Sequence, residues 1–309
     1  MWEIFLKTLP FFALIGLGYG AARIRFFTPE GTAYLTKFVF YFALSAMLFR
    51  FSANLALGDI LDWPFVFAYL LGSTVIYVLA TSVAMARGLI VAEAAVEAQV
   101  AVIGNVGFLG IPMLILLLGE AAIGPVMMVL AVDLIVFGSL IVILITGSRD
   151  GRMSLGVFRT VGLGLLKNPM IVSITLGLLV SGLGLPVPAP ANEFLQILGA
   201  AATPGALFAI GASLATKSAE RVAVAGWLSF CKLVLHPAAV AVSALMIFDI
   251  AAYPAGVMIA AAALPVAGNV YIIAQHYGVA PSRVSASILI STALSVLTIS
   301  GVIAWVTSL

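Results

Sequence analysis

Apolar residues run along this chain in ten long segments, separated by short stretches that are charged or rich in glycine and proline. A helix of about 20 apolar residues crosses the hydrocarbon core of a membrane. The pattern therefore predicts an all-α polytopic membrane protein with about ten transmembrane helices. The expected spans are 3–23, 32–52, 63–86, 94–118, 121–147, 166–184, 192–215, 222–247, 251–277 and 282–307.

Composition supports the membrane assignment for the whole chain. Of 309 residues, 63% are hydrophobic and only 8% are charged, whereas a soluble domain carries roughly 25% charged residues. No stretch is typical of a separate soluble domain. The single cysteine, Cys231, excludes an intrachain disulfide and is read as a small buried residue.

Basic residues alternate between the two sides of the expected bundle. The even-numbered connections hold acidic residues such as Glu120 and Asp249 instead. Because cytoplasmic loops are enriched in lysine and arginine, we expect the odd-numbered connections in the cytoplasm and both termini outside. The odd-numbered connections hold 11 of the 14 basic residues: Arg23, Arg25, Lys37, Arg87, Arg149, Arg152, Arg159, Lys167, Lys217, Arg221 and Arg283.

The longest polar stretch, 147–159, divides the segments into two sets of five. We therefore expect a first five-helix repeat at 1–147, a cytoplasmic linker at 148–165 and a second repeat at 166–309. An odd number of spans in each half gives the halves opposite orientations, so related halves would form an inverted repeat.

The fourth and ninth segments each contain the tripeptide Gly-Asn-Val, at 104–106 and 268–270, with Pro112 and Pro265 nearby. Proline removes a backbone donor and glycine loosens a helix, so we expect both helices to break within the membrane. Paired breaks in two halves of a membrane protein indicate a transporter's binding site. The alternative is that the glycines serve close helix packing and the prolines only bend their helices.

The groups near these breaks favour a small anion. Asn105 and Asn269 can each donate and accept hydrogen bonds, and the N-termini of broken helices carry partial positive charge. Gly107 and Gly268 allow the backbone to open and belong to the same candidate site. The same amides can also coordinate a cation.

Three ionisable residues are candidates for ion coupling or charge balance. Asp133 lies about midway along the fifth span, where a carboxyl can carry a proton, bind sodium, pair with a base or make a structural hydrogen bond. Lys232 and His236 share one face of the eighth span. Lys232 either balances the charge of Asp133, binds an anionic substrate or extends toward water. His236 either makes a hydrogen bond between packed helices or relays a proton.

Sequence motifs for enzymes are missing. The chain has no metalloprotease, nucleotide-binding or prenyltransferase motif and no cysteine/histidine metal cluster. Potassium-filter sequences are also missing. We therefore expect neither an enzyme, a metal site nor a nucleic-acid partner, and the cofactors under consideration are coupling ions, H⁺ or Na⁺.

With these residues in view, the chain resembles the auxin efflux carrier family, which includes bacterial malate and malonate permease-like proteins. The resemblance covers nearly the whole length. Its most specific element is NVGFLGIP at 105–112, supported by KLVLHP at 232–237 and by residues 264–278.

The resemblance implies two inverted five-helix repeats, with helices four and nine crossing at a site formed by Asn105, Pro112, Pro265 and Asn269. It also implies a scaffold of helices one, two, six and seven, which forms a homodimer through helices two and seven. Helices three to five and eight to ten would form a transport domain that moves in the elevator manner.

The expected function is secondary transport of a mono- or dicarboxylate across the inner cell membrane. The long cytoplasmic loop of the plant hormone carriers is missing here, which favours small organic acids over auxin as the substrate. One alternative is a sodium- or proton-coupled exchanger centred on Asp133. Another is a membrane sensor that binds a ligand without moving it.

Overall fold

The structure, a computed structural model, describes residues 2–54, 62–150, 155–215 and 222–308. Within these ranges every named element is a helix, which confirms the all-α prediction. Six helical stretches are long and apolar enough to cross a membrane, and a seventh is added when the bent pair 159–167 and 169–182 is counted as one span. α1 covers the first expected span in full, and shorter or interrupted helices cover the remaining expected segments.

In the first half, several long helices contain a π-helical segment, in which the helix is locally wider: η1, η2 and η4 are of this kind, whereas η3 is a short 3-10 helix. Such segments are rare and often lie at functional sites. The elements are α1 (Trp2–Arg23), α2 (Pro29–Phe38), η1 (Val39–Ala43), α3 (Leu44–Ala53), α5 (Trp63–Ala86), α6 (Val91–Val102), η2 (Val106–Gly110), α7 (Ile111–Leu118), η3 (Glu120–Ala122), α8 (Ile123–Val132), η4 (Asp133–Phe137) and α9 (Gly138–Asp150).

The second half begins with a sharp bend, because α10 and α11 meet at 73° beside Asn168. The expected linker, 148–165, includes helical residues of α9 and α10 as well as 151–154, which lie outside the described residues. The elements are α10 (Leu155–Lys167), α11 (Pro169–Gly182), α12 (Ala189–Ala200), α13 (Ala202–Leu214), α14 (Val222–Phe230), η5 (Cys231–Leu235), α15 (His236–Val242), η6 (Ser243–Ile247), α16 (Ala252–Ala262), α17 (Gly268–Tyr277) and α18 (Pro281–Val306).

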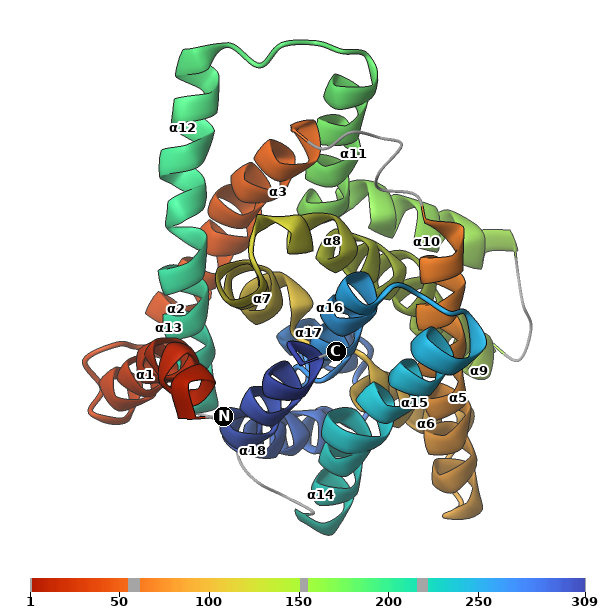
Figure 1. Cartoon of the computed structure of the whole chain (residues 1–309). Coiled ribbons are helices and arrows are strands. Elements are labelled where there is room, and N and C mark those ends of the chain that lie inside the picture. The colour runs from red at the N-terminus through yellow and green to blue at the C-terminus, as the bar shows by residue number, and fades with distance from the viewer. Residues whose placement is uncertain (1, 55–61, 151–154, 216–221, 309) are drawn as a thin grey trace.

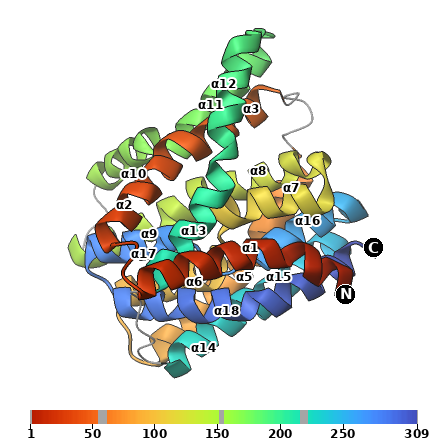
Figure 2. The ribbon, with the colours of Figure 1, turned by 90° about the vertical axis from the view of Figure 1, so that its left-hand side faces the viewer.

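The helices pack in two groups. In the first, α1 packs along α13, and α3 packs along α11 and α12. The helices α3, α11 and α12 rise together out of the main body (Figures 1 and 2). In the second, α5 packs on α6 and α15, and α14 packs on α18.

Glycine allows the closest helix contact in the first group. A side chain on Gly18 would overlap the backbone of Phe208, and one on Gly211 would overlap the backbone of Ile15. Small residues of this kind let α1 and α13 approach each other, as is common between helices in membranes.

Candidate functional site

The two Gly-Asn-Val segments meet at a crossing of broken helices. The chain is extended between α6 and η2 and again between α16 and α17, and an antiparallel bridge joins Gly104 to Val266. The backbone N–H of Asn105 donates to the Pro265 carbonyl at 2.8 Å, and that of Ala267 donates to the Ile103 carbonyl at 3.1 Å. Because lipid offers no partners for freed backbone groups, this pairing stabilises both breaks at once.

A small cavity of about 60 Å³ lies beside the crossing. It has room for a few water-sized groups, which is enough for a carboxylate group. Two helical segments begin at the cavity, η2 after Asn105 and α17 after Ala267. Their N-terminal ends place partial positive charge at its wall.

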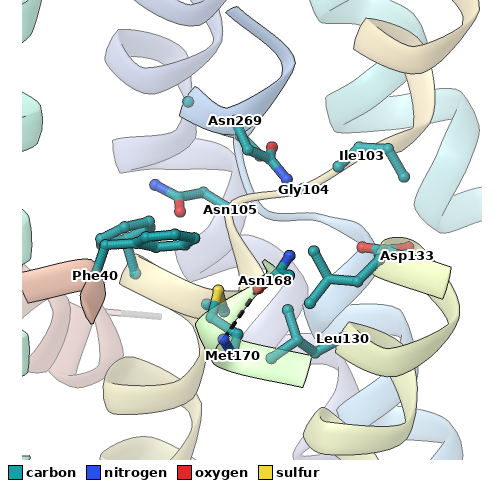
Figure 3. A pocket seen from close by; sticks show the side chains of 14 residues that line it. Phe40, Ile103, Gly104, Asn105, Leu130, Asp133, Asn168, Met170 and Asn269 are labelled. Atoms are coloured by element: carbon teal, nitrogen blue, oxygen red, sulfur yellow. Dashed lines mark hydrogen bonds between the residues drawn. The ribbon is translucent and has the colours of Figure 1, made fainter. Parts of the chain in front are cut away.

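Polar side chains from four parts of the chain surround this space (Figure 3). Asn105 and Asn269 lie at the crossing segments, Asn168 lies below them, and Asp133 stands across the cavity from Phe40. The side-chain carbonyl oxygen of Asn269 and the Oδ2 atom of Asp133 are buried, and no hydrogen-bond partner for either lies among the described residues. Buried polar atoms normally have a partner, so these two are available to a bound molecule.

The structure brings together five of the site residues expected from the sequence. Asn105, Gly107, Gly268, Asn269 and Asp133 all line the cavity.

The two prolines of the expected site lie elsewhere. Pro265 contributes its backbone carbonyl to the crossing but does not line the cavity. Pro112 lies in the first turn of α7 and lines a separate hollow with Phe11 and Met47. α7 continues η2 without interruption, as one helical stretch over 106–118, so the helix break lies earlier, at Gly104.

Asn168 is a polar cavity residue that was not among the site residues expected from the sequence. Its side-chain oxygen caps α11 by accepting the Met170 backbone N–H at 3.0 Å. Its position before Pro169 was a signal for a helix start, but nothing in the sequence placed that start beside the crossing. Asn168 adds a third amide to the cavity wall.

Asp133 is held by a tyrosine from another helix. It is 4% exposed and begins η4. The Tyr69 hydroxyl of α5 donates to its Oδ1 atom at 2.8 Å, while Oδ2 has no partner in the part of the chain that the structure describes. One oxygen is therefore fixed and the other is free to bind a proton or another ligand.

Lys232 and His236 form a second polar network that does not line the cavity. The Lys232 Nζ atom lies 3.2 Å from His236 Nδ1, and His236 Nε2 lies 2.9 Å from Ser73 Oγ. An ammonium group can only donate, so Nδ1 accepts and the imidazole proton is assigned to Nε2, which donates to Ser73. The predicted shared face of Lys232 and His236 is confirmed by this contact.

The two glycines of the repeated tripeptide have different surroundings, which gives a stability prediction. A methyl group on Gly104 would lie 3.3 Å from the Ala261 carbonyl oxygen and from Lys232 Cε and Nζ, whereas one on Gly268 would have nothing within 4 Å. We expect Gly104→Ala to lower the free energy of unfolding by about 1–3 kcal/mol through overpacking. Gly268→Ala, at the start of a helix, is expected to be neutral or to stabilise by about 0.4–1 kcal/mol.

Thermal unfolding of the two purified variants in one detergent measures this difference. Equal melting temperatures would show that the close contact of Gly104 with Lys232 does not constrain the crossing.

Amides and helix N-termini around a cavity, at the crossing of two broken helices, are typical of the binding sites of secondary transporters. The comparison with known proteins agrees with this class. Residues 3–303 match the family described as Membrane transport protein. A protein of Rhizobium meliloti (strain 1021) named "Putative malonate transporter" is 31% identical over 312 residues, which cover 98% of this chain and 96% of that protein.

The chain therefore belongs to the membrane transport protein family, and its resemblance to the auxin efflux carriers is confirmed. It is a multi-pass membrane transporter and not an enzyme.

Proposed function

We propose that this protein moves a small organic anion, a mono- or dicarboxylate such as malonate, across the inner cell membrane. The observation that carries the proposal is the crossing, where Asn105 and Asn269 line one cavity together with two helix N-termini. Amide N–H groups and helix N-termini bind carboxylates well. The name of the relative supports the same class of substrate.

The proposed mechanism is elevator-type alternating access by two inverted five-helix repeats with both termini outside. The packing of α1, α3, α11 and α13 in one group supports a scaffold, and the second group of helices supports a moving transport domain. We also propose a homodimer through the second and seventh spans, where α3 and α12 leave the main body (Figure 2).

Counterflow in proteoliposomes tests this function. Vesicles are loaded with unlabelled malonate, and the uptake of external labelled malonate is followed. We expect uptake that is faster than in empty vesicles and that is inhibited by other small dicarboxylates. Failure of acetate, malate and malonate alike to exchange would contradict the proposal and favour a sensor that binds without transport.

A second candidate, an ion-coupled exchanger, is favoured by the buried Asp133 with its unpartnered oxygen. In this case Asp133 binds the coupling ion, which makes transport respond to an ion gradient. We expect Asp133→Asn to abolish the stimulation of malonate uptake by an imposed pH gradient while exchange at equal pH continues. Stimulation of the same size in the variant would exclude Asp133 as the proton site.

A further inference from the structure

Lys232 is a buried ammonium group at the crossing that the proposed function does not yet use. Its side chain is 0% exposed and belongs to the π-helical segment η5. A buried charge costs several kcal/mol unless nearby groups compensate for it. The groups that surround this ammonium therefore indicate its role.

The first of these groups is a backbone carbonyl that the helix break has freed. In an uninterrupted helix, the Ala262 carbonyl would accept the N–H of Val266. Here that N–H donates to the Ser291 hydroxyl oxygen at 3.1 Å, and the Lys232 ammonium donates to the Ala262 carbonyl in its place. The carbonyl lies at the C-terminal end of α16, where the helix carries partial negative charge.

The ammonium also lies directly behind the crossing. A methyl group added to Gly104 would come within 3.3 Å of Lys232 Nζ and of the Ala261 carbonyl oxygen. Gly104 lines the cavity and Lys232 does not. The Gly104 backbone therefore lies between the ammonium and the cavity.

The ammonium also contacts His236 Nδ1 at 3.2 Å, and a carboxylate acts on it from farther away. Asp133 lines the cavity, and its charge acts on that of Lys232 without a direct ion pair between them in the part of the chain that the structure describes. A freed carbonyl, a negative helix end and a carboxylate together attract a small cation.

We propose that Lys232 is a tethered cation that fills a monovalent-cation site at the crossing and thereby makes transport independent of sodium. This inference rests on the proposed function and specifies its coupling, because sodium has no place where the ammonium already lies. Removal of the side chain beyond Cβ leaves a site for a soluble alkylammonium ion.

Thermal unfolding in detergent tests this inference through Lys232→Ala. The variant lacks three carbons and the ammonium, which n-propylammonium supplies. We expect Lys232→Ala to melt several degrees below wild type in choline chloride and to recover at least half of that loss in n-propylammonium chloride at equal ionic strength. Wild type and the surface control Lys37→Ala are expected to melt at the same temperature in choline, sodium and n-propylammonium chloride.

Lys232→Met separates a filled cation site from a general effect of the salt. It keeps most of the volume of the side chain but has no charge, so we expect no recovery in n-propylammonium. The inference is overturned if Lys232→Ala is as stable as wild type in choline, if both variants recover equally, or if neither recovers.

If Lys232→Ala yields no folded protein, the wild-type protein alone tests the inference. Equal melting temperatures in sodium and choline, with equal malonate uptake in both salts, would support the tethered cation, and stabilisation or faster uptake in sodium would overturn it. The melting measurements need no transport, so a failure of malonate uptake alone would count against the proposed function and not against the cation site.

Discussion

Asn105→Asp and Asn269→Asp are each expected to reduce malonate uptake by about 100-fold or more while leaving a folded protein. Each change keeps the shape of the side chain but replaces an N–H donor with a negative charge at the cavity wall. A hydrogen bond to a charged group contributes about 1.5–3 kcal/mol, and each 1.4 kcal/mol corresponds to a factor of ten. Repulsion between the new carboxylate and an anionic substrate adds to this loss.

Asn54→Asp is the matched control for both changes. Asn54 lies at the end of α3, where its side-chain nitrogen donates to the Arg50 carbonyl at 2.6 Å, and it does not line the cavity. We expect this variant to keep wild-type uptake. Initial uptake rates in proteoliposomes that contain equal amounts of each protein measure the series, and near-wild-type rates for Asn105→Asp and Asn269→Asp would remove both amides from the substrate site.

Glu97→Gln is expected to cause the largest loss of stability, about 3 kcal/mol or more. The Glu97 carboxylate is 1% exposed and pairs with two arginines, Arg87 and Arg283. This cluster joins the end of α5, the middle of α6 and the start of α18. Removal of one member of a buried ion pair is strongly destabilising: among the described residues, Arg87 loses its carboxylate partner and Arg283 keeps only Glu93.

Glu93→Gln is the matched control on the same helix. The side chain of Glu93 is 29% exposed and contacts only Arg283 among the ion pairs of the described residues, at 3.2 Å. Exposed pairs of this kind contribute at most about 1 kcal/mol. Melting temperatures in detergent compare the two variants, and equal losses would show that burial does not make the Glu97 cluster important.

The helical class and the position of the site could be predicted from the sequence because both depend on local signals. Long apolar segments require helices in lipid, and the repeated Gly-Asn-Val marked the interrupted helices that the structure brings together. The amides at 105 and 269 were assigned to the cavity from residue type and spacing, and both line it.

Other parts of the site depend on contacts between distant segments, which a single sequence does not specify. Asn168 was recognisable as a helix start, but only the bend of 73° between α10 and α11 brings it near the crossing. Tyr69 looks like an ordinary apolar-segment residue until its hydroxyl meets Asp133. Pro112 does not mark the break, because the π-helical segment η2 leads directly into α7 and the helix 106–118 is not interrupted at the proline.

The π-helical segments were likewise not predictable. Four of them, η1, η2, η4 and η5, contain residues of the cavity or of the adjacent lysine network: Phe40, Gly107, Asp133 and Lys232. A π-helical turn contains one residue more than an α-helical turn, and this insertion has no strong sequence signature. Its effect is nevertheless large, because it changes the direction in which every later side chain of that helix points.

Equilibrium binding of labelled malonate to the purified protein tests most directly the claim that the crossing binds a small organic anion. The account predicts saturable binding to wild type and to Asn54→Asp, displacement of the label by unlabelled dicarboxylates, and loss of binding in Asn105→Asp and Asn269→Asp. Saturable binding that is the same in all four proteins would contradict it, because the anion would then bind away from the crossing.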